Sequence, residues 1–237
     1  MSSLFPKVFV DFDGTITTHD VGNEFFRKFG NEAESLKAVA EWKSDGLSGR
    51  DLILREAGFV KTTQNEALEF AKSFTIDSFF SAFVDYCRQN EVELTILSDG
   101  LDFYISEILS ANHLSEIPFY SNIARFDTDT IKIEFPYEST CPKCANCKGH
   151  QILTRTGIDD LIVYVGNGFS DRCAVDYADI IFAKDDLLKY CEANNITFFP
   201  FEDFSEVLSK FRKTFESKKF RKRHRAELKR REAYLSE

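Results

Sequence analysis

Two aspartates one residue apart, Asp11 and Asp13, follow the apolar stretch Val8–Val10 and precede Gly14. Along a strand their side chains would point to opposite faces. At the carboxyl end of a strand, where a glycine lets the chain turn, both carboxylates can converge on one crevice. Carboxylates there can act as a nucleophile, as a general acid or base, or as metal ligands. The alternative is an acidic turn after a buried edge strand, and the rest of the chain has to decide.

Five apolar segments with strand character alternate with stretches of helical spacing. They are Lys7–Val10, Glu93–Leu97, Leu161–Val165, Ile180–Phe182 and Thr197–Phe199. This alternation predicts an α/β fold with a doubly wound parallel sheet wrapped by helices. Open sheets of this kind bind their ligands at the carboxyl ends of the strands.

Roughly eighty residues of mostly helical spacing separate the first two strand segments, although a crossover needs only about a dozen. The surplus predicts a helical cap over residues 16–75, inserted into a core of residues 1–15 and 76–209. Alternating apolar residues over 119–135 predict a small β-hairpin. A basic C-terminal helix is expected over 210–237, and its last twenty residues are expected to fray or stand free.

Composition narrows the possible partners. The chain has a formal charge of −9 and is 43% apolar, which favours a folded protein and does not suggest a nucleic-acid partner. No initial charged segment with an apolar h-region and no membrane-spanning apolar run appears, so a cytoplasmic protein is expected. Six cysteines in such a chain indicate thiols or metal ligands rather than a disulfide framework. No feature of the sequence determines the oligomeric state.

Three later segments also lie at or just beyond predicted strand ends or helix starts: Leu97–Gly100, Lys148 and Gly166–Asp171. Together with Asp11 and Asp13 they resemble the haloacid-dehalogenase superfamily of phosphohydrolases. The resemblance covers nearly the whole chain. The predicted cap lies between the first and second motifs, as in the subgroup with a helical cap there.

The resemblance implies a role for each member of the aspartate pair. Asp11 would attack phosphorus and form an aspartyl-phosphate. Asp13 would protonate the leaving oxygen and then deprotonate the water that breaks the intermediate. The superfamily's ATPases carry Thr at the second position, so Asp13 favours a phosphatase or phosphomutase.

The other motifs imply the phosphate-binding groups. Ser98 and the backbone amide near Gly100 would hold phosphate oxygens, with Asp99 beside them, and Lys148 would supply a fixed positive charge. Read singly, Ser98 can be a strand-end turn residue and Lys148 a solvated lysine. Their order along the chain favours catalysis.

Mg²⁺ is implied both by the resemblance and by electrostatics, because two carboxylates cannot approach a dianionic phosphate without a cation. Its expected ligands are the Asp11 carboxylate, the Asp13 backbone carbonyl and the Asn167 side chain, with Asp171 ligating the metal or orienting a metal-bound water. The superfamily usually has Asp where Asn167 stands. An amide oxygen brings no charge, so a weaker hold on the metal is expected.

A cysteine-rich segment, Cys141-x2-Cys144-x2-Cys147, ends directly before Lys148. Three thiols at this spacing suit zinc, although a closed structural site needs four ligands, and His150 or a carboxylate could supply the fourth. The alternative is a set of reduced thiols packed in a loop. A Cys-rich stretch ending in Cys-Lys resembles both the methionine-salvage phosphatases, which act on 2-hydroxy-3-keto-5-methylthiopentenyl-1-phosphate, and the phosphocholine/phosphoethanolamine phosphatases.

The cap is expected to set substrate specificity. Asp20 and Glu24, one turn apart, could face the substrate, or could simply favour a helix start. An acid near Asp20 resembles phosphoserine phosphatases, which also need a cap arginine such as Arg50 or Arg55. The Ser98-Asp99 pair resembles the phosphocholine-type enzymes, whereas Gly100–Phe103 looks more like the methionine-salvage phosphatases.

These features predict a Mg²⁺-dependent phosphatase of a small phosphorylated metabolite. The motifs most resemble those of the methionine-salvage phosphatases, and phosphoserine or phosphocholine/phosphoethanolamine phosphatases are the alternatives. A rival of another class is a non-catalytic phosphometabolite-binding protein, which Asn167 and the basic tail make conceivable. The presence of the other motif residues argues against it.

Overall fold

The computed structural model describes residues 6–217 and 221–235. Its strands are β1 (Pro6–Val10), β2 (Glu93–Leu101), β3 (Phe119–Asp127), β4 (Thr130–Glu134), β5 (Leu161–Gly166), β6 (Ile180–Ala183) and β7 (Phe199–Pro200). Its helices are α1 (Val21–Phe29), α2 (Glu32–Lys43), α3 (Gly49–Ala57), α4 (Gln64–Ala71), α5 (Phe80–Gln89), α6 (Asp102–Ala111), α7 (Lys148–Arg155), α8 (Arg172–Val175), α9 (Asp185–Ala193), α10 (Phe204–Glu216) and α11 (His224–Leu235), with a 3-10 turn η1 (Phe169–Asp171). No helix in the described part of the chain is long and apolar enough to cross a membrane.

The chain forms two compact units. The first, here the core unit, comprises Met1–Asp11, Asp77–Leu97 and Lys148–Glu237, and the second, the cap unit, comprises Phe12–Ile76 and Ser98–Cys147. The helical segment expected as a cap lies in the cap unit. Residues 98–147, which the sequence pattern grouped with the core, belong to the same unit.

The sheet is mostly parallel, which confirms the predicted fold class. Its strand order is β4-β3-β2-β1-β5-β6-β7. β1 pairs in parallel with β2 and with β5, β5 with β6, and β6 with β7. Every residue of β5 is buried, as expected for a strand covered on both faces. β2 continues past the expected end at Leu97 to Leu101.

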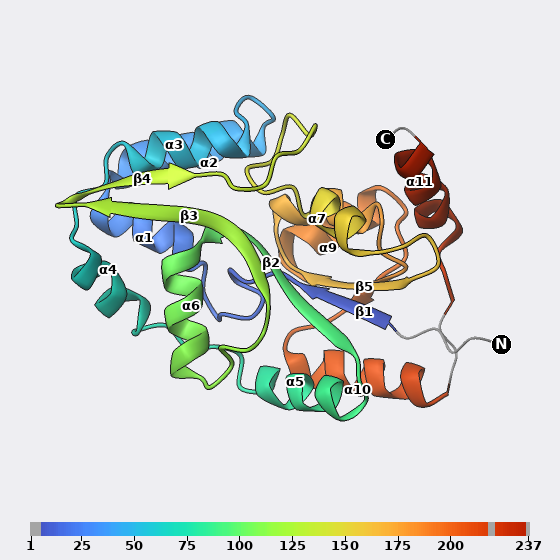
Figure 1. Cartoon of the computed structure of the whole chain (residues 1–237). Coiled ribbons are helices and arrows are strands. Elements are labelled where there is room, and N and C mark those ends of the chain that lie inside the picture. Colours follow the sequence, from blue (N-terminus) through green and yellow to red (C-terminus); the bar gives the residue numbers. More distant parts are fainter. Residues whose placement is uncertain (1–5, 218–220, 236–237) are drawn as a thin grey trace. The chain divides into compact units, whose positions relative to one another are not determined.

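In the core unit, α5 and α10 run side by side (Figure 1) and share a phenylalanine interface. Phe204 lies 4.9 Å from Phe80 and 5.6 Å from Phe83, measured between ring centroids. Phe211 lies 5.6 Å from Phe83 on the next turns. All four rings are almost fully buried, and each contributes about 2 kcal/mol through burial. These phenylalanines therefore form part of the apolar core of this unit.

The basic C-terminal segment does not stand free, so that expectation was wrong for the described residues. Arg230 on α11 is fully buried, with its guanidinium 3.2 Å from the Asp179 carboxylate. The same carboxylate accepts from the backbone N–H of Arg223 at 3.0 Å. Periodicity alone could not show this, because α11 is attached through a buried charged pair rather than an apolar face.

The cap unit has its own aromatic core. The Phe25 ring lies 5.1 Å from Phe103 and 5.4 Å from Phe29, and Phe103 lies 5.3 Å from Phe126. β3 and β4 form the predicted antiparallel hairpin, with α6 against β3 and α3 against β4 (Figure 1). These contacts explain why the hairpin belongs with the cap helices.

Candidate active site

One group of predicted site residues lies in the core unit, at the carboxyl ends of β1 and β5. Val10 and Val165 are register partners, and the Asp11 N–H extends the pairing by donating to the Val165 carbonyl at 2.9 Å. Asn167 follows β5 two residues later. Parallel pairing therefore puts Asp11 and Asn167 at the same edge of the sheet.

Lys148 pairs with two carboxylates of the core-unit group, Asp11 and Asp171. It begins α7, and its side chain is 1% exposed. Its Nζ lies 2.5 Å from Asp11 Oδ1 and 2.6 Å from Asp171 Oδ1, and it donates to Ser170 Oγ at 3.0 Å. A buried ammonium is tolerated when it is paired and hydrogen-bonded. The structure therefore places Lys148 as a fixed buried cation beside Asp11.

Asp171 holds that lysine in place. Its Oδ1 accepts from Lys148 and from the Tyr164 hydroxyl at 2.5 Å, and its Oδ2 accepts from the N–H groups of Asn167 at 2.9 Å and Gly168 at 2.7 Å. Both oxygens thus have two donors each. If Asp171 bound a metal directly, one of these four hydrogen bonds would be lost. If Asp171 only orients Lys148, all four hydrogen bonds can stay as they are.

Another group of residues, in the cap unit, surrounds Asp13. Gly14 adopts φ 73°, the left-handed conformation that a turn here needs. Asp13 Oδ2 accepts from Ser98 Oγ at 3.2 Å and from the Tyr104 hydroxyl at 2.8 Å. Its Oδ1 accepts from the Gly22 N–H at 3.2 Å, at the start of α1. The carboxylate is therefore held by three donors.

Tyr104 is a site residue that the sequence did not reveal. Its side chain is fully buried, and burial together with the Asp13 carboxylate raises the pKa of its phenol well above the ordinary value. A Cβ on Gly100 would lie 1.7 Å from the Tyr104 hydroxyl, so glycine is required there. From sequence alone, a tyrosine in an apolar helix is expected to be a core residue. Only the hydrogen bond to Asp13 shows that Tyr104 also contacts a predicted site residue.

The predicted phosphate-binding segment is fixed by an asparagine. Ser98 Oγ accepts from the Gly100 N–H at 2.9 Å. Asn146 donates through its N–H to Asp99 Oδ1 at 2.8 Å and through Nδ2 to the carbonyls of Ser98, at 3.0 Å, and Tyr120, at 2.9 Å. Asp99 thus positions the loop before Lys148. Its part in ligand binding stays a prediction.

The two predicted cap carboxylates lie at the start of α1, and both are exposed. Asp20 is the N-cap residue and accepts from the Asn23 N–H at 2.8 Å. Glu24 lies 3.5 Å from the His19 ring. These contacts account for both residues structurally, and a contact with substrate stays a prediction.

The three cysteines of the cap unit gather at one point. The sulfur atoms of Cys141, Cys144 and Cys147 lie within 4.8 Å of one another, and Cys141 Sγ is 3.5 Å from Cys144 Sγ. Cys147 is buried and the other two are half-buried. The structure thus brings together the thiols that the spacing predicted as a possible zinc site.

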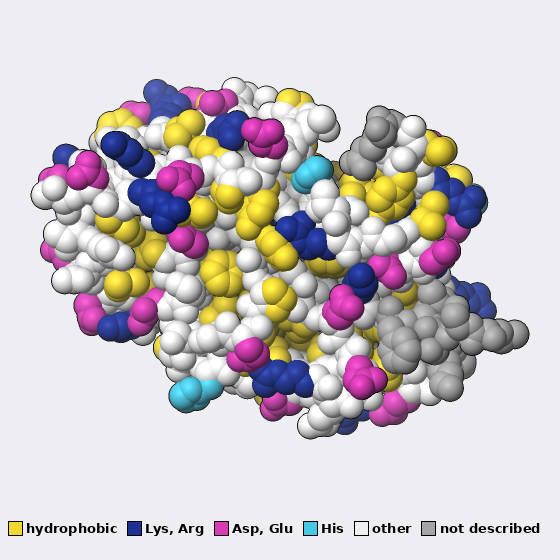
Figure 2. Space-filling model, in the orientation of Figure 1, with side chains coloured by type: hydrophobic (Ala, Val, Ile, Leu, Met, Phe, Trp, Pro, Cys, Tyr) yellow, Lys and Arg dark blue, Asp and Glu magenta, His cyan; other side chains and the backbone are white. Residues whose placement is uncertain are grey.

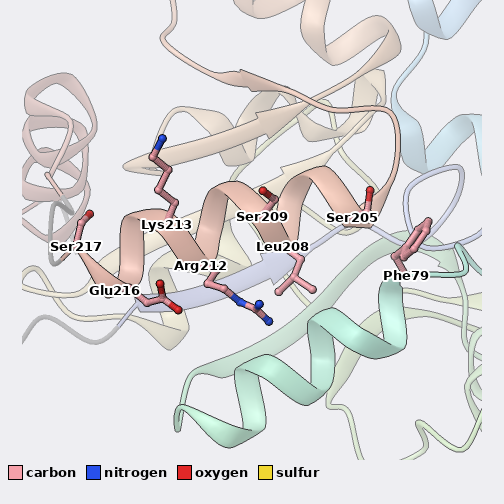
Figure 3. Close-up of a pocket in the computed structure, with 8 residues that line it drawn as sticks. All are labelled: Phe79, Ser205, Leu208, Ser209, Arg212, Lys213, Glu216 and Ser217. Carbon is pink, nitrogen blue, oxygen red and sulfur yellow. The ribbon is translucent and has the colours of Figure 1, made fainter.

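A separate groove of about 560 Å³ runs along α10 in the core unit (Figure 3). Its lining residues are Phe79, Ser205, Leu208, Ser209, Arg212, Lys213, Glu216 and Ser217. None of the predicted catalytic, phosphate-binding or metal-binding residues lines it.

The surface drawn in Figure 2 carries charges of both signs. Acidic and basic side chains are interspersed on this face rather than gathered into a patch of one sign.

The chain matches a family of known proteins over most of its length. A family described as "Putative Phosphatase" matches residues 7–188. The chain is 29% identical over 218 residues to a 2-hydroxy-3-keto-5-methylthiopentenyl-1-phosphate phosphatase of Bacillus cereus (strain B4264), covering 90% of this chain and 98% of the relative. A relative of the same name from Bacillus mycoides (strain KBAB4) is 28% identical over the same coverage.

The fold is shared with solved phosphatase structures. A phosphoserine phosphatase in a phospho-aspartyl intermediate analogue state aligns with a TM-score of 0.69 at 18% identity, over 88% of this chain and 99% of that one. A substrate-bound phosphoserine phosphatase aligns with a TM-score of 0.66 at 17% identity, over 89% and 99%. The chain belongs to the "Putative Phosphatase" family and is a phosphatase that acts on phosphoric monoesters.

Proposed function

We propose that the protein hydrolyses the phosphate monoester of a small metabolite through an aspartyl-phosphate on Asp11. The observation that carries this proposal is the buried Lys148, which is paired with Asp11 and Asp171 in the core unit. A cation fixed beside a nucleophilic carboxylate is suited to phosphoryl transfer, where charge develops on the phosphoryl oxygens.

The reaction then has two displacement steps. An Asp11 carboxylate oxygen attacks phosphorus while the bond to the leaving oxygen breaks, and that oxygen takes a proton from Asp13. In the second step Asp13 takes a proton from water, which attacks phosphorus and releases inorganic phosphate and the Asp11 carboxylate. Proton transfer of this kind contributes about a hundred- to ten-thousand-fold in rate. Ser98, Tyr104 and the Gly22 N–H would position the Asp13 carboxyl.

The donor set fits a magnesium ion. The Asp11 carboxylate, the Asn167 side-chain oxygen and the Asp13 backbone carbonyl are all hard oxygen ligands. In the core unit Asp11 and Asp171 together outweigh the single charge of Lys148 by one negative charge, so a dianionic phosphate requires further positive charge. Bound there, Mg²⁺ would neutralise phosphate charge. Asn167 supplies no charge of its own.

The substrate we favour is 2-hydroxy-3-keto-5-methylthiopentenyl-1-phosphate, since the curated relatives that cover this chain carry that activity in their names. Phosphoserine needs a cationic partner for its carboxylate, and both arginines considered from the sequence are engaged within the cap unit. Arg55 contacts Glu34 at 2.9 Å and Glu41 at 2.8 Å, and Arg50 lies over the Phe135 ring. Phosphocholine and phosphoethanolamine stay as alternatives.

A cytoplasmic location is part of the proposal. All six cysteines are thiols rather than disulfides, which suits a reducing compartment.

Turnover of p-nitrophenyl phosphate with Mg²⁺ tests the proposed chemistry. Wild type should hydrolyse it, and Asp11→Asn should lose the activity, because an amide cannot form the phosphoenzyme. Asp85→Asn, a change at an exposed residue of α5, is the matched control and should keep wild-type activity. If wild type and Asp11→Asn hydrolyse it equally slowly while both bind phosphate, the protein is a phosphometabolite-binding protein. A screen of phosphorylated metabolites that includes the three candidate substrates then tests the choice of substrate.

A further inference from the structure

The thiols of Cys141, Cys144 and Cys147 lie on the connection between β4 and α7 and take no part in the proposed hydrolysis. Residues 135–147 contain neither helix nor strand. Irregular segments of this length are uncommon in compact proteins unless they serve a function or are held together by something else. The segment nevertheless ends in a buried stretch, with Asn146 1% and Cys147 6% exposed.

We propose that this segment binds a zinc ion through the thiolates of Cys141, Cys144 and Cys147. Around a tetrahedral zinc with Zn–S bonds of about 2.3 Å, sulfur atoms lie about 3.8 Å apart. The three sulfur atoms here are within 4.8 Å of one another, and one pair is 3.5 Å apart. The thiols are therefore close enough to share one ion without being joined in a disulfide.

The donor chemistry selects the kind of metal. Thiolates prefer soft or borderline ions, whereas Mg²⁺ and Ca²⁺ prefer oxygen. The Cys-x2-Cys-x2-Cys spacing alone would also suit an iron–sulfur cluster. In a four-iron cluster, however, each cysteine binds a different iron atom, which requires sulfur atoms farther apart than around a single ion. The short separations therefore favour one mononuclear zinc.

The surrounding cap unit supports this loop at two points. The Gly49 N–H, at the start of α3, donates to the Lys143 carbonyl at 2.8 Å, and a Cβ on Gly49 would lie 3.0 Å from the backbone nitrogen of Ala145. Asn146 ties the loop to Ser98 and Asp99. The backbone is thus held on both sides of Cys144.

A structural zinc site has four ligands, so three thiolates leave one coordination position for a further ligand. Two cysteines outside the cluster are less suited to zinc, because burial raises the pKa of Cys87 to about 12 and that of Cys191 to about 11 and so disfavours their thiolates.

Zinc here would act on the loop rather than on the substrate. Cys147 directly precedes Lys148. A metal that orders the loop also restricts the backbone that carries the phosphate-binding lysine. The inference does not depend on the identity of the substrate, because metal content is measured without turnover.

Metal analysis by mass spectrometry tests the site on full-length protein purified under reducing conditions, without chelator and without added zinc. Wild type should carry about one zinc per chain, and Cys141→Ser/Cys144→Ser less than a tenth of that. Cys191→Ala, a cysteine change outside the cluster, is the matched control and should keep its zinc. Zinc-free wild type, stoichiometric iron, or equal zinc in wild type and the double variant would overturn the proposal.

Cobalt substitution tests the ligands without relying on a variant that folds. Wild-type protein loaded with Co²⁺ should show intense thiolate-to-cobalt charge-transfer absorption and a tetrahedral visible spectrum. A spectrum of cobalt bound only through oxygen or nitrogen would overturn thiolate ligation.

Discussion

At the scale of single residues, the proposed catalysis depends on which partners each charged group has. Lys148 is 1% exposed, and an unpaired ammonium buried to that extent costs several kcal/mol. Asp11 and Asp171 offset that cost, and Tyr164 with two backbone N–H groups completes the partners of Asp171. These contacts fix the lysine beside Asp11, the proposed nucleophile.

Tyr104→Phe tests the positioning of Asp13. The change removes the hydroxyl that donates to Asp13 Oδ2 and keeps the ring. A hydrogen bond to a charged group contributes about 1.5–3 kcal/mol, so kcat should fall about 10- to 100-fold with little change in KM. Steady-state kinetics measures both, and Tyr86→Phe on α5 is the matched control. An unchanged kcat would mean that Tyr104 only fills space.

At the scale of elements, α11 contacts the chain near the C-terminal ends of α7 and α8, and the predicted site residues Lys148 and Asp171 lie at the N-terminal ends of these two helices. The Tyr234 hydroxyl donates to the Leu153 carbonyl near the end of α7 at 3.0 Å. Arg230 Nη1 donates to the Tyr177 carbonyl at 2.5 Å, just after α8. Lys148 begins α7, and Asp171 directly precedes α8. The basic segment thus serves the fold of the core unit.

Arg230→Met should destabilise the core unit by about 3–5 kcal/mol, because it leaves the Asp179 carboxylate buried without its cation. Urea unfolding followed by circular dichroism measures the change in the free energy of unfolding. Arg231→Met, at the exposed neighbouring position, should change it by less than about 0.5 kcal/mol. A loss of similar size in both variants would show that the buried pair is not the cause.

At the scale of the whole molecule, stability should depend on pH through Glu56. This carboxyl is 5% exposed and accepts from the Ser35 hydroxyl. Burial above all raises its pKa to about 7 from an ordinary 4.5. The folded state therefore binds a proton that the unfolded state releases between these values. Stability should fall as pH rises from about 4.5 to 7, by about 3 kcal/mol from this group.

Glu56→Gln should flatten this dependence. The amide keeps an acceptor for Ser35 but cannot ionise, so the variant should gain stability relative to wild type as the pH is raised. Thermal unfolding midpoints at pH 5.5 and pH 8.5 measure the difference, with Glu69→Gln on an exposed face of α4 as the control. An equal pH dependence in wild type and Glu56→Gln would show that Glu56 ionises normally.

The sequence by itself determined the parallel sheet, the hairpin and the order of the predicted catalytic motifs. Strand patterns are local, and parallel strands bring their carboxyl ends to one edge, so Asp11 and Asn167 could be placed from their positions beyond β1 and β5. The family resemblance then supplied the expected role of each motif residue.

Only the tertiary structure decided how these groups are partnered. Asp13 meets Tyr104 and Ser98 across 91 and 85 positions of sequence, and Lys148 meets Asp11 across 137. The docking of α11 likewise depends on a carboxylate 51 positions away from Arg230. Burial makes such polar contacts obligatory, but which distant group fulfils them depends on packing. A local pattern of residue types does not determine which distant group forms each contact.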